Sequence, residues 1–212
     1  MKATVEGGAV KAPQGSAARL VEVVLGEIGY IEGPRDNETK YGAFTKANFQ
    51  PWCGSFVNWC ANEAGVKMPN TVYTPAGAQA FIKAGTWQPA ETATPQVGDI
   101  AYMDFPNDGV DRISHVGVVV AVNNDGTVDL GEGNTAPDKK GNQRNGGQAC
   151  IKNRAYKKKN GSKLRKSQPV VIVGFGRPAF GTPVKTKPQP EAKPKKAAVK
   201  KEAAPVTESK KK

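Results

Sequence analysis

Apolar residues in the first part of the chain recur at three- and four-residue spacing, which is typical of amphipathic helices. Ser16 is a good N-cap for the first helix, and Gly29, Gly65 and Gly85 are placed to end three of them. A polar stretch, residues 32–39, separates the first helix from a shorter one. The pattern predicts four helices, which cover residues 16–29, 41–47, 53–65 and 74–85.

From Gly98 onward the pattern changes to short apolar runs rich in valine and isoleucine, which favour strands. Helices followed by such runs predict an α+β fold in which N-terminal helices pack on an antiparallel β-sheet. We expect one domain over residues 16–180, a flexible N-terminus at 1–15 and a tail at 181–212. The predicted strands cover residues 99–103, 114–122, 127–132 and 169–175.

The positive charge of the chain is concentrated in its C-terminal part. Residues 1–150 hold 12 Lys and Arg against 16 Asp and Glu, whereas residues 151–212 hold 19 against 3, and the whole chain has a net charge of +12. The Lys/Pro/Ala-rich tail cannot bury enough apolar surface to fold, so we expect it to be disordered. Such a basic segment favours attachment to an anionic wall polymer, a membrane surface or nucleic acid. Without aromatic residues in the tail, specific recognition of nucleic acid has no support.

The cysteines and the chain ends exclude some classes of protein. Three cysteines do not make a disulfide framework, and Cys53 and Cys60 would lie ~10 Å apart on one helix, beyond bridging distance. A single histidine argues against a structural zinc site. The first residues contain no apolar run typical of a signal peptide, and no later stretch could span a bilayer. We therefore expect a chain made in the cytoplasm of its host.

Cys53 lies at the start of its predicted helix, where unpaired N–H groups and the positive end of the helix dipole stabilise a thiolate. A cysteine in an apolar helix is more often a core residue, and this interpretation fits Cys60. Cys53 follows a Pro-containing loop and precedes a glycine, so a catalytic role is favoured there. A nucleophilic thiol needs a base and a group that orients the base. The only histidine, His115, is the candidate base.

The segment Asn-Asn-Asp-Gly at residues 123–126 predicts a hairpin turn between two strands. A two-residue turn places His115 opposite Glu132 or Asn134, depending on which residues form the turn. Both acceptors lie on one face, because the side-chain period of a strand is two. A three-residue loop would instead place Gly133 opposite His115.

Several motifs, in this order, resemble the cysteine, histidine-dependent amidohydrolase/peptidase (CHAP) domain of phage lysins and bacterial cell wall hydrolases. Two flanking segments, 27–34 and 173–178, are also similar, so the resemblance covers about residues 16–180. The central motifs are Trp52-Cys53-Gly54-x-Phe56-Val57-x-x-Cys60, Gly98-Asp99-Ile100, Ser114-His115-Val116-Gly117-Val118-Val119 and Gly131-Glu132-Gly133-Asn134-Thr135.

The resemblance implies a papain-like fold and cleavage of an amide bond in bacterial peptidoglycan. Carried over by position, Cys53 is the nucleophile, His115 is the general base and then acid, and Glu132 orients His115. Asn134 matches a further polar position of the family. By papain-like analogy, Gln50 is a candidate donor to the oxyanion.

Calcium is the one cofactor that the resemblance suggests, because some lysins of this family bind it before the catalytic cysteine. Asp36 and Asn37 offer oxygen ligands there, but the spacing is not that of an alternating Asp loop, and a helix-capping loop is the alternative. No other cofactor is expected. We expect Cys150 to pack on a strand.

The leading hypothesis is a monomeric peptidoglycan amidase or endopeptidase. It would be a phage endolysin that reaches the cell wall after the membrane is breached, or a virion-associated lysin. The alternative is a non-catalytic basic protein that binds an envelope polymer or nucleic acid through its tail. The choice between amidase and endopeptidase stays open, because both use the same catalytic groups.

Overall fold

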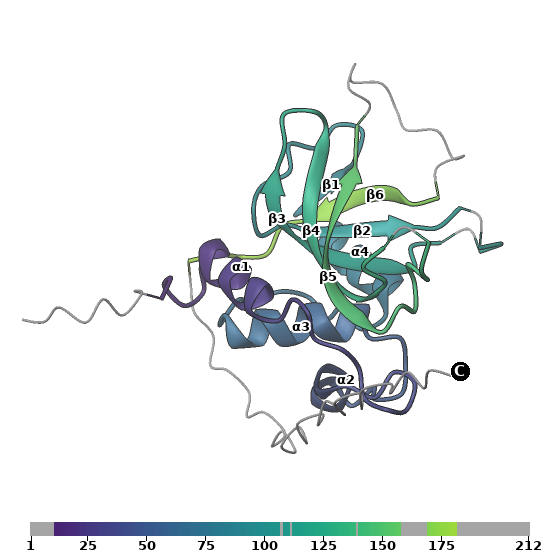
Figure 1. The fold of residues 1–212 in the computed structure, drawn as a ribbon. Helices are drawn as coiled ribbons and strands as arrows, with labels where there is room; N and C mark the ends of the chain where they lie inside the picture. The colour runs from purple at the N-terminus through teal and green to yellow at the C-terminus, as the bar shows by residue number, and fades with distance from the viewer. Residues whose placement is uncertain (1–10, 107, 111, 139, 158–168, 182–212) are drawn as a thin grey trace, which may run out of the picture.

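Helices precede strands along the chain, and the strands form one antiparallel sheet, so the predicted α+β class is confirmed (Figure 1). The computed structural model describes residues 11–106, 108–110, 112–138, 140–157 and 169–181. The sheet order is β1-β6-β2-β3-β4-β5. Within the described residues the elements are α1 (Ala17–Gly26), α2 (Lys40–Thr45), α3 (Cys53–Glu63), α4 (Thr74–Lys83), β1 (Trp87–Pro89), β2 (Ile100–Asp104), β3 (His115–Val122), β4 (Thr127–Thr135), β5 (Gln148–Ala155) and β6 (Val171–Gly176).

The helices begin within one residue of the predicted positions, and the first two are capped by local side chains. Ser16 Oγ accepts a hydrogen bond from the Arg19 N–H at 3.1 Å and caps α1. Thr39 caps α2 in the same way. The predicted end of α2 near Ala47 is wrong by two residues, since Lys46 adopts a left-handed φ of 60° and stops the helix at Thr45.

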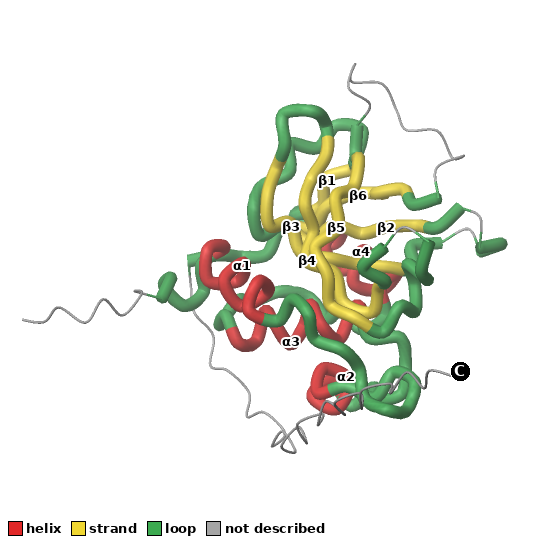
Figure 2. Tube along the Cα trace, in the orientation of Figure 1, coloured by secondary structure: helices red, strands yellow, loops and turns green. Residues whose placement is uncertain are grey.

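Alternate residues of β3 pack in two separate apolar clusters. Val116 and Val118 belong to the cluster that contains Leu20 of α1 and Phe56 of α3. Val119 belongs to a second cluster, formed mainly by strand residues. Figure 2 shows α1 and α3 together on one side of the sheet. The central strands are therefore buried on both faces, which explains their almost continuous apolar sequence.

The predicted two-residue turn between β3 and β4 is wrong. Residues 124–126 form a three-residue loop, closed by a 3.0 Å hydrogen bond from the Asn123 N–H to the Thr127 carbonyl. The register then shifts at a bulge between Val119 and Ala121. Beyond the bulge, Gly117 lies opposite Glu132. His115, two residues before Gly117, therefore shares a sheet face with Glu132, as predicted, although the loop is longer than predicted.

Two strands were not predicted in full. Cys150 lies on a strand, as predicted. The extent of β5 and the presence of β1 were not predicted from the sequence. Along β5 the usual alternation is inverted, because Ile151 is exposed and Lys152 is buried. Because cations turned inward take the place of apolar residues along β5, its hydropathy pattern lacks the alternation by which a half-buried strand is predicted.

The start and the end of the described domain lie against each other. The Gly15 N–H donates to the Ala64 carbonyl at 2.7 Å, and the Gly181 N–H donates to the Gly15 carbonyl at 2.9 Å. The rest of the predicted flexible N-terminus, residues 1–10, and the predicted tail from 182 onward lie outside the described residues. Among the described residues no helix has the length and apolarity needed to cross a membrane. All three cysteines are free.

The segment before α4 packs against the first turn of α3. Asn58 donates hydrogen bonds to the Gly54 carbonyl at 2.7 Å and to Thr71 Oγ1 at 2.6 Å. A Cβ atom at Gly54 would collide with the carbonyl of Thr71 and would lie 2.8 Å from the Cα of Val72. Glycine after Cys53 is therefore required by the close approach of this segment.

We predict that Gly54→Ala lowers the free energy of unfolding by about 1–3 kcal/mol, because the added methyl group has only backbone atoms to displace. Gly26→Ala is the matched control, since nothing lies within 4 Å of its added Cβ. The control should be neutral or up to ~1 kcal/mol more stable. Urea denaturation of the two variants measures the difference, and equal stabilities would contradict the packing argument.

Candidate active site

Cys53, His115 and Glu132 are brought together from α3, β3 and β4. Cys53 is the first residue of α3 and is 4% exposed. No side chain among the described residues caps this helix, so its first N–H groups keep their hydrogen-bonding capacity for a ligand. An anion at this position is favoured by those N–H groups and by the helix dipole.

The residues beside Cys53 are fixed by ring packing and by two partly buried hydrogen bonds. The indole Nε1 of Trp52 donates to Glu32 Oε2 at 2.9 Å. The ring of Trp52 stacks on Tyr41, with a centroid distance of 5.3 Å. Tyr41 donates in turn to Glu27 Oε2 at 2.6 Å. Glu27 and Glu32, which belong to the segment that precedes the cysteine motif, thus anchor the aromatic residues next to Cys53.

His115 Nε2 lies 3.0 Å from Glu132 Oε2, and both side chains are completely buried. The two residues are not directly opposite in the register, because Glu132 faces Gly117. A Cβ atom at Gly117 would lie 2.9 Å from Glu132 Cγ. The missing side chain at Gly117 leaves the space through which Glu132 reaches His115.

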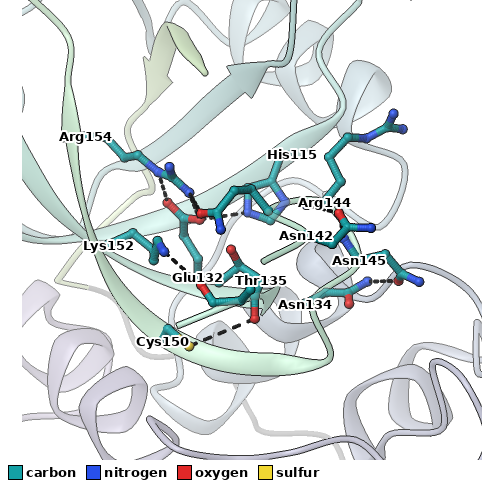
Figure 3. Close-up of polar contacts among 12 residues, drawn as sticks. His115, Glu132, Asn134, Thr135, Asn142, Arg144, Asn145, Cys150, Lys152 and Arg154 are labelled. Carbon is teal, nitrogen blue, oxygen red and sulfur yellow. Dashed lines mark hydrogen bonds and ion pairs between the residues drawn. The ribbon is translucent and has the colours of Figure 1, made fainter. Parts of the chain in front are cut away.

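Arg154 binds the other side of Glu132, and the sequence analysis did not identify it. Its Nε donates to Oε1 and its Nη2 donates to Oε2, both at 2.8 Å (Figure 3). Nearby on β5, Lys152 donates to the Ala136 carbonyl at 2.8 Å. The signal that could have identified both cations is their spacing of two in a segment that follows Cys150.

The ionisation of Glu132 fixes the hydrogen on His115. Burial by itself would raise the pKa of Glu132, but hydrogen bonds from Arg154 and His115 outweigh burial and lower the pKa to about 2. An ionised carboxylate only accepts hydrogen bonds. His115 Nε2 is therefore the donor to Glu132, and Nδ1 is the ring nitrogen that Glu132 does not bind.

His115 is positively charged at neutral pH when Cys53 is a thiolate. Burial by itself would lower the pKa of His115, but the charge of Cys53, its hydrogen bond and then Glu132 raise the pKa to about 9. Among the described residues Nδ1 makes no hydrogen bond of regular geometry. The ring of Phe105 packs edge-on against the imidazole, with a centroid distance of 5.7 Å. When Cys53 is ionised, the two groups form a buried thiolate–imidazolium pair.

Asn134 lies near this group but bonds elsewhere. Its Nδ2 donates to Asn37 Oδ1 at 3.1 Å and to Asn145 Oδ1 at 2.9 Å, and its Oδ1 accepts from the Gly147 N–H at 3.2 Å. Asn134 and Asn37 both have a φ of 58°. Asn134 therefore connects the end of β4 to the loop before α2, and these bonds are not directed to His115 (Figure 3).

The weaker candidates from the sequence, an oxyanion donor and a set of calcium ligands, lie on loops. Gln50 is exposed, three residues before Cys53, and its role as an oxyanion donor stays a prediction. Asp36 accepts hydrogen bonds from Asn37 at 2.9 Å and from Asn145 at 3.3 Å. Among the described residues no three His, Cys, Asp or Glu side chains form a metal cluster. The oxygens of Asp36 and Asn37 serve here as acceptors for amide donors, and calcium binding stays a prediction.

We predict that Cys53→Ala lowers the pKa of His115 below its value of about 9, because the charge of Cys53 is the largest favourable cause. As His115 is the only histidine, NMR of the ring nitrogens follows its titration without ambiguity once any purification tag is removed. Cys60→Ala, which removes a buried thiol on the same helix, is the control and should keep the parent midpoint. An unchanged midpoint in Cys53→Ala would contradict the thiolate–imidazolium pair.

Comparison with known proteins supports the resemblance noted in the sequence. Residues 45–134 match the family model described as the CHAP domain. No curated protein matches the chain. The matched segment begins within α2 and ends on β4, so it includes Cys53, His115, Glu132 and Asn134. The central part of this α+β chain thus matches a CHAP domain, and Arg154 on β5 follows the matched residues.

Proposed function

We propose that the protein is a hydrolase that cleaves an amide bond of bacterial peptidoglycan by cysteine nucleophilic catalysis. The observation that supports this most strongly is the carboxylate-bound imidazole of His115 beside Cys53 at the start of α3. The match of residues 45–134 to the CHAP domain supports the amide bond as the target and peptidoglycan as the substrate.

In this mechanism the Cys53 thiolate attacks the carbonyl carbon of the scissile amide. Negative charge develops on the carbonyl oxygen, where the N–H groups of the first turn of α3 can donate to it; Gln50 is a second candidate donor. When the C–N bond breaks, His115 gives its Nδ1 proton to the leaving amine. A thioester then links Cys53 to the acyl group.

Hydrolysis of the thioester returns the site to its first state. His115, now neutral, takes a proton from a water molecule, whose oxygen attacks the thioester carbonyl. The C–S bond breaks, the acid product leaves, and Cys53 is again a thiolate beside the protonated ring. Glu132 stays ionised throughout, because it stabilises the imidazolium without taking its proton.

We further propose that the protein acts as a lysin, in monomeric form, on the walls of intact bacteria. The basic segment from residue 181 to 212 would add weak attachment to an anionic wall polymer or membrane surface, since residues 183–212 contain 10 Lys against 3 Glu. The enzyme would reach the wall from the host cytoplasm after membrane breach, or from a virion.

We predict that Cys53→Ala and His115→Ala each reduce peptidoglycan hydrolysis by at least about 10³-fold, because neither half of the pair reacts alone. Loss of turbidity of a susceptible bacterium measures the effect. Cys60→Ala should stay active, since its thiol lies in the core. Lysis retained by the Cys53→Ala protein would falsify the proposed function.

The released fragments identify the bond that is cleaved. An amidase would free the amino group of the first residue of the peptide stem and leave bare glycan strands. An endopeptidase would create a new amino terminus within the peptide. Mass spectrometry of digests of defined peptidoglycans separates these outcomes for the active parent protein.

We predict that removal of residues 182–212 weakens lysis of whole cells at low ionic strength but not hydrolysis of soluble muropeptides. The charges of this segment contribute only to attachment, and salt screens them. The difference should disappear as salt is raised. If the deletion abolished all activity while Cys53→Ala had no effect, the alternative function as a basic binding protein would be correct.

A further inference from the structure

We infer that Arg154 is a positioning residue of the active site, which acts through Glu132 to hold His115 in the orientation and tautomer that Cys53 needs. The inference rests on the proposed function for its catalytic meaning. It deepens that function by assigning a role to β5, which follows the residues that match the family model.

The contact between Arg154 and Glu132 is a two-point fork. Nε binds Oε1 and Nη2 binds Oε2, each at 2.8 Å, and the arginine side chain is only 12% exposed. Two parallel hydrogen bonds from a planar guanidinium fix the rotation of the carboxylate as well as its position. Oε2 can accept one further hydrogen bond, and His115 Nε2 donates it at 3.0 Å.

The electrostatic effect of Arg154 decides the tautomer of His115. Glu132 is completely buried, and a buried carboxyl without a cationic partner tends to become protonated. A protonated Glu132 could donate to Nε2, which would leave the ring hydrogen on Nδ1 and remove the base that faces Cys53. Because Arg154 donates to both oxygens, Glu132 can only accept, and Nδ1 remains available to Cys53.

The length of the side chain explains why β5 can supply this contact. Arg154 lies opposite Val128, four residues from Glu132 along β4, so only a long side chain on the same face reaches the carboxylate. Lys152 lies nearer, opposite Leu130, but its ammonium group donates to the carbonyls of Ala136 and Pro137. Lys152 therefore holds the loop after β4, and Arg154 is the cation that binds Glu132.

Arg154 is itself held by the loop between β4 and β5. Its Nη2 donates to Gln143 Oε1 at 3.3 Å. On the same loop, the guanidinium of Arg144 lies over the ring of Phe105, which packs on His115. Figure 3 shows this loop beside the imidazole and the Arg154–Glu132 pair. The loop thus contacts Arg154 directly and reaches His115 through Phe105.

The experiment compares Arg154→Gln and Arg154→Lys with Arg177→Gln. Arg177 makes an equally bidentate contact with the buried carboxylate of Asp99, at 2.8 and 2.9 Å, in a different part of the domain. Its loss should lower the thermal midpoint without affecting the active site. This variant is therefore a matched control for the structural cost of breaking a buried arginine–carboxylate pair.

Three measurements are made on each full-length variant. The first is the rate of alkylation of Cys53 by iodoacetamide as a function of pH, followed by mass spectrometry of its peptide. The second is the pH profile of peptidoglycan hydrolysis. The third is the ¹⁵N NMR signature of the imidazole above the His115 pKa of about 9, where the ring is neutral and the spectrum reports the tautomer of the only histidine.

For Arg154→Gln we expect a loss of at least about tenfold in alkylation and hydrolysis below neutral pH, an acid limb displaced to higher pH, and a changed tautomer. Arg154→Lys, which keeps the charge but loses the fork, should give intermediate values. Arg177→Gln should keep the parent profile and tautomer. Should Arg154→Gln fail to fold, Arg154→Lys provides the test.

Profiles and tautomers of the Arg154 variants that equal those of Arg177→Gln would overturn the inference, because Arg154 would then contribute only to stability. The alkylation and NMR measurements need no substrate. If the parent protein reacts with iodoacetamide but does not hydrolyse peptidoglycan, the proposed function fails, while those two measurements still decide the role of Arg154.

Discussion

The active site depends on keeping a carboxylate charged in a place that water does not reach. Glu132 has no exposed surface, so its charge must be compensated by protein donors. Arg154 supplies two of them and His115 supplies the third. These three residues come from three adjacent strands, and the sheet must therefore form correctly before the imidazole has its orientation.

The sheet achieves this arrangement through two compensating irregularities. The three-residue loop at 124–126 would displace the pairing of β3 and β4, but the bulge between Val119 and Ala121 restores the register that puts His115 and Glu132 on one face. Gly117 then provides the space that the Glu132 side chain crosses. A bulge beside a site commonly serves to redirect side chains in this manner.

Cys53, the proposed nucleophile, lies in a separate part of the domain. Helix α3 is held at its first turn by the Trp52–Glu32 hydrogen bond and by the close contact of Gly54 with the segment before α4. His115, the proposed base, lies on the sheet, and α3 packs on β3 and β4. The proposed chemistry thus arises where a helix N-terminus meets a strand end, with the loop after β4 beside both the imidazole and Arg154.

The sequence by itself determined the helices and the apolar central strands, and it named Cys53, His115 and Glu132 as candidates, because periodicity and motif order are local signals. It could not determine the bulge, since a register shift depends on how two strands pair. Nor could it identify Arg154 as the partner of Glu132, because 22 residues separate them and a cation on a strand usually faces solvent. Only the tertiary structure decided that β5 turns this cation inward, where the buried charge of Glu132 requires a partner.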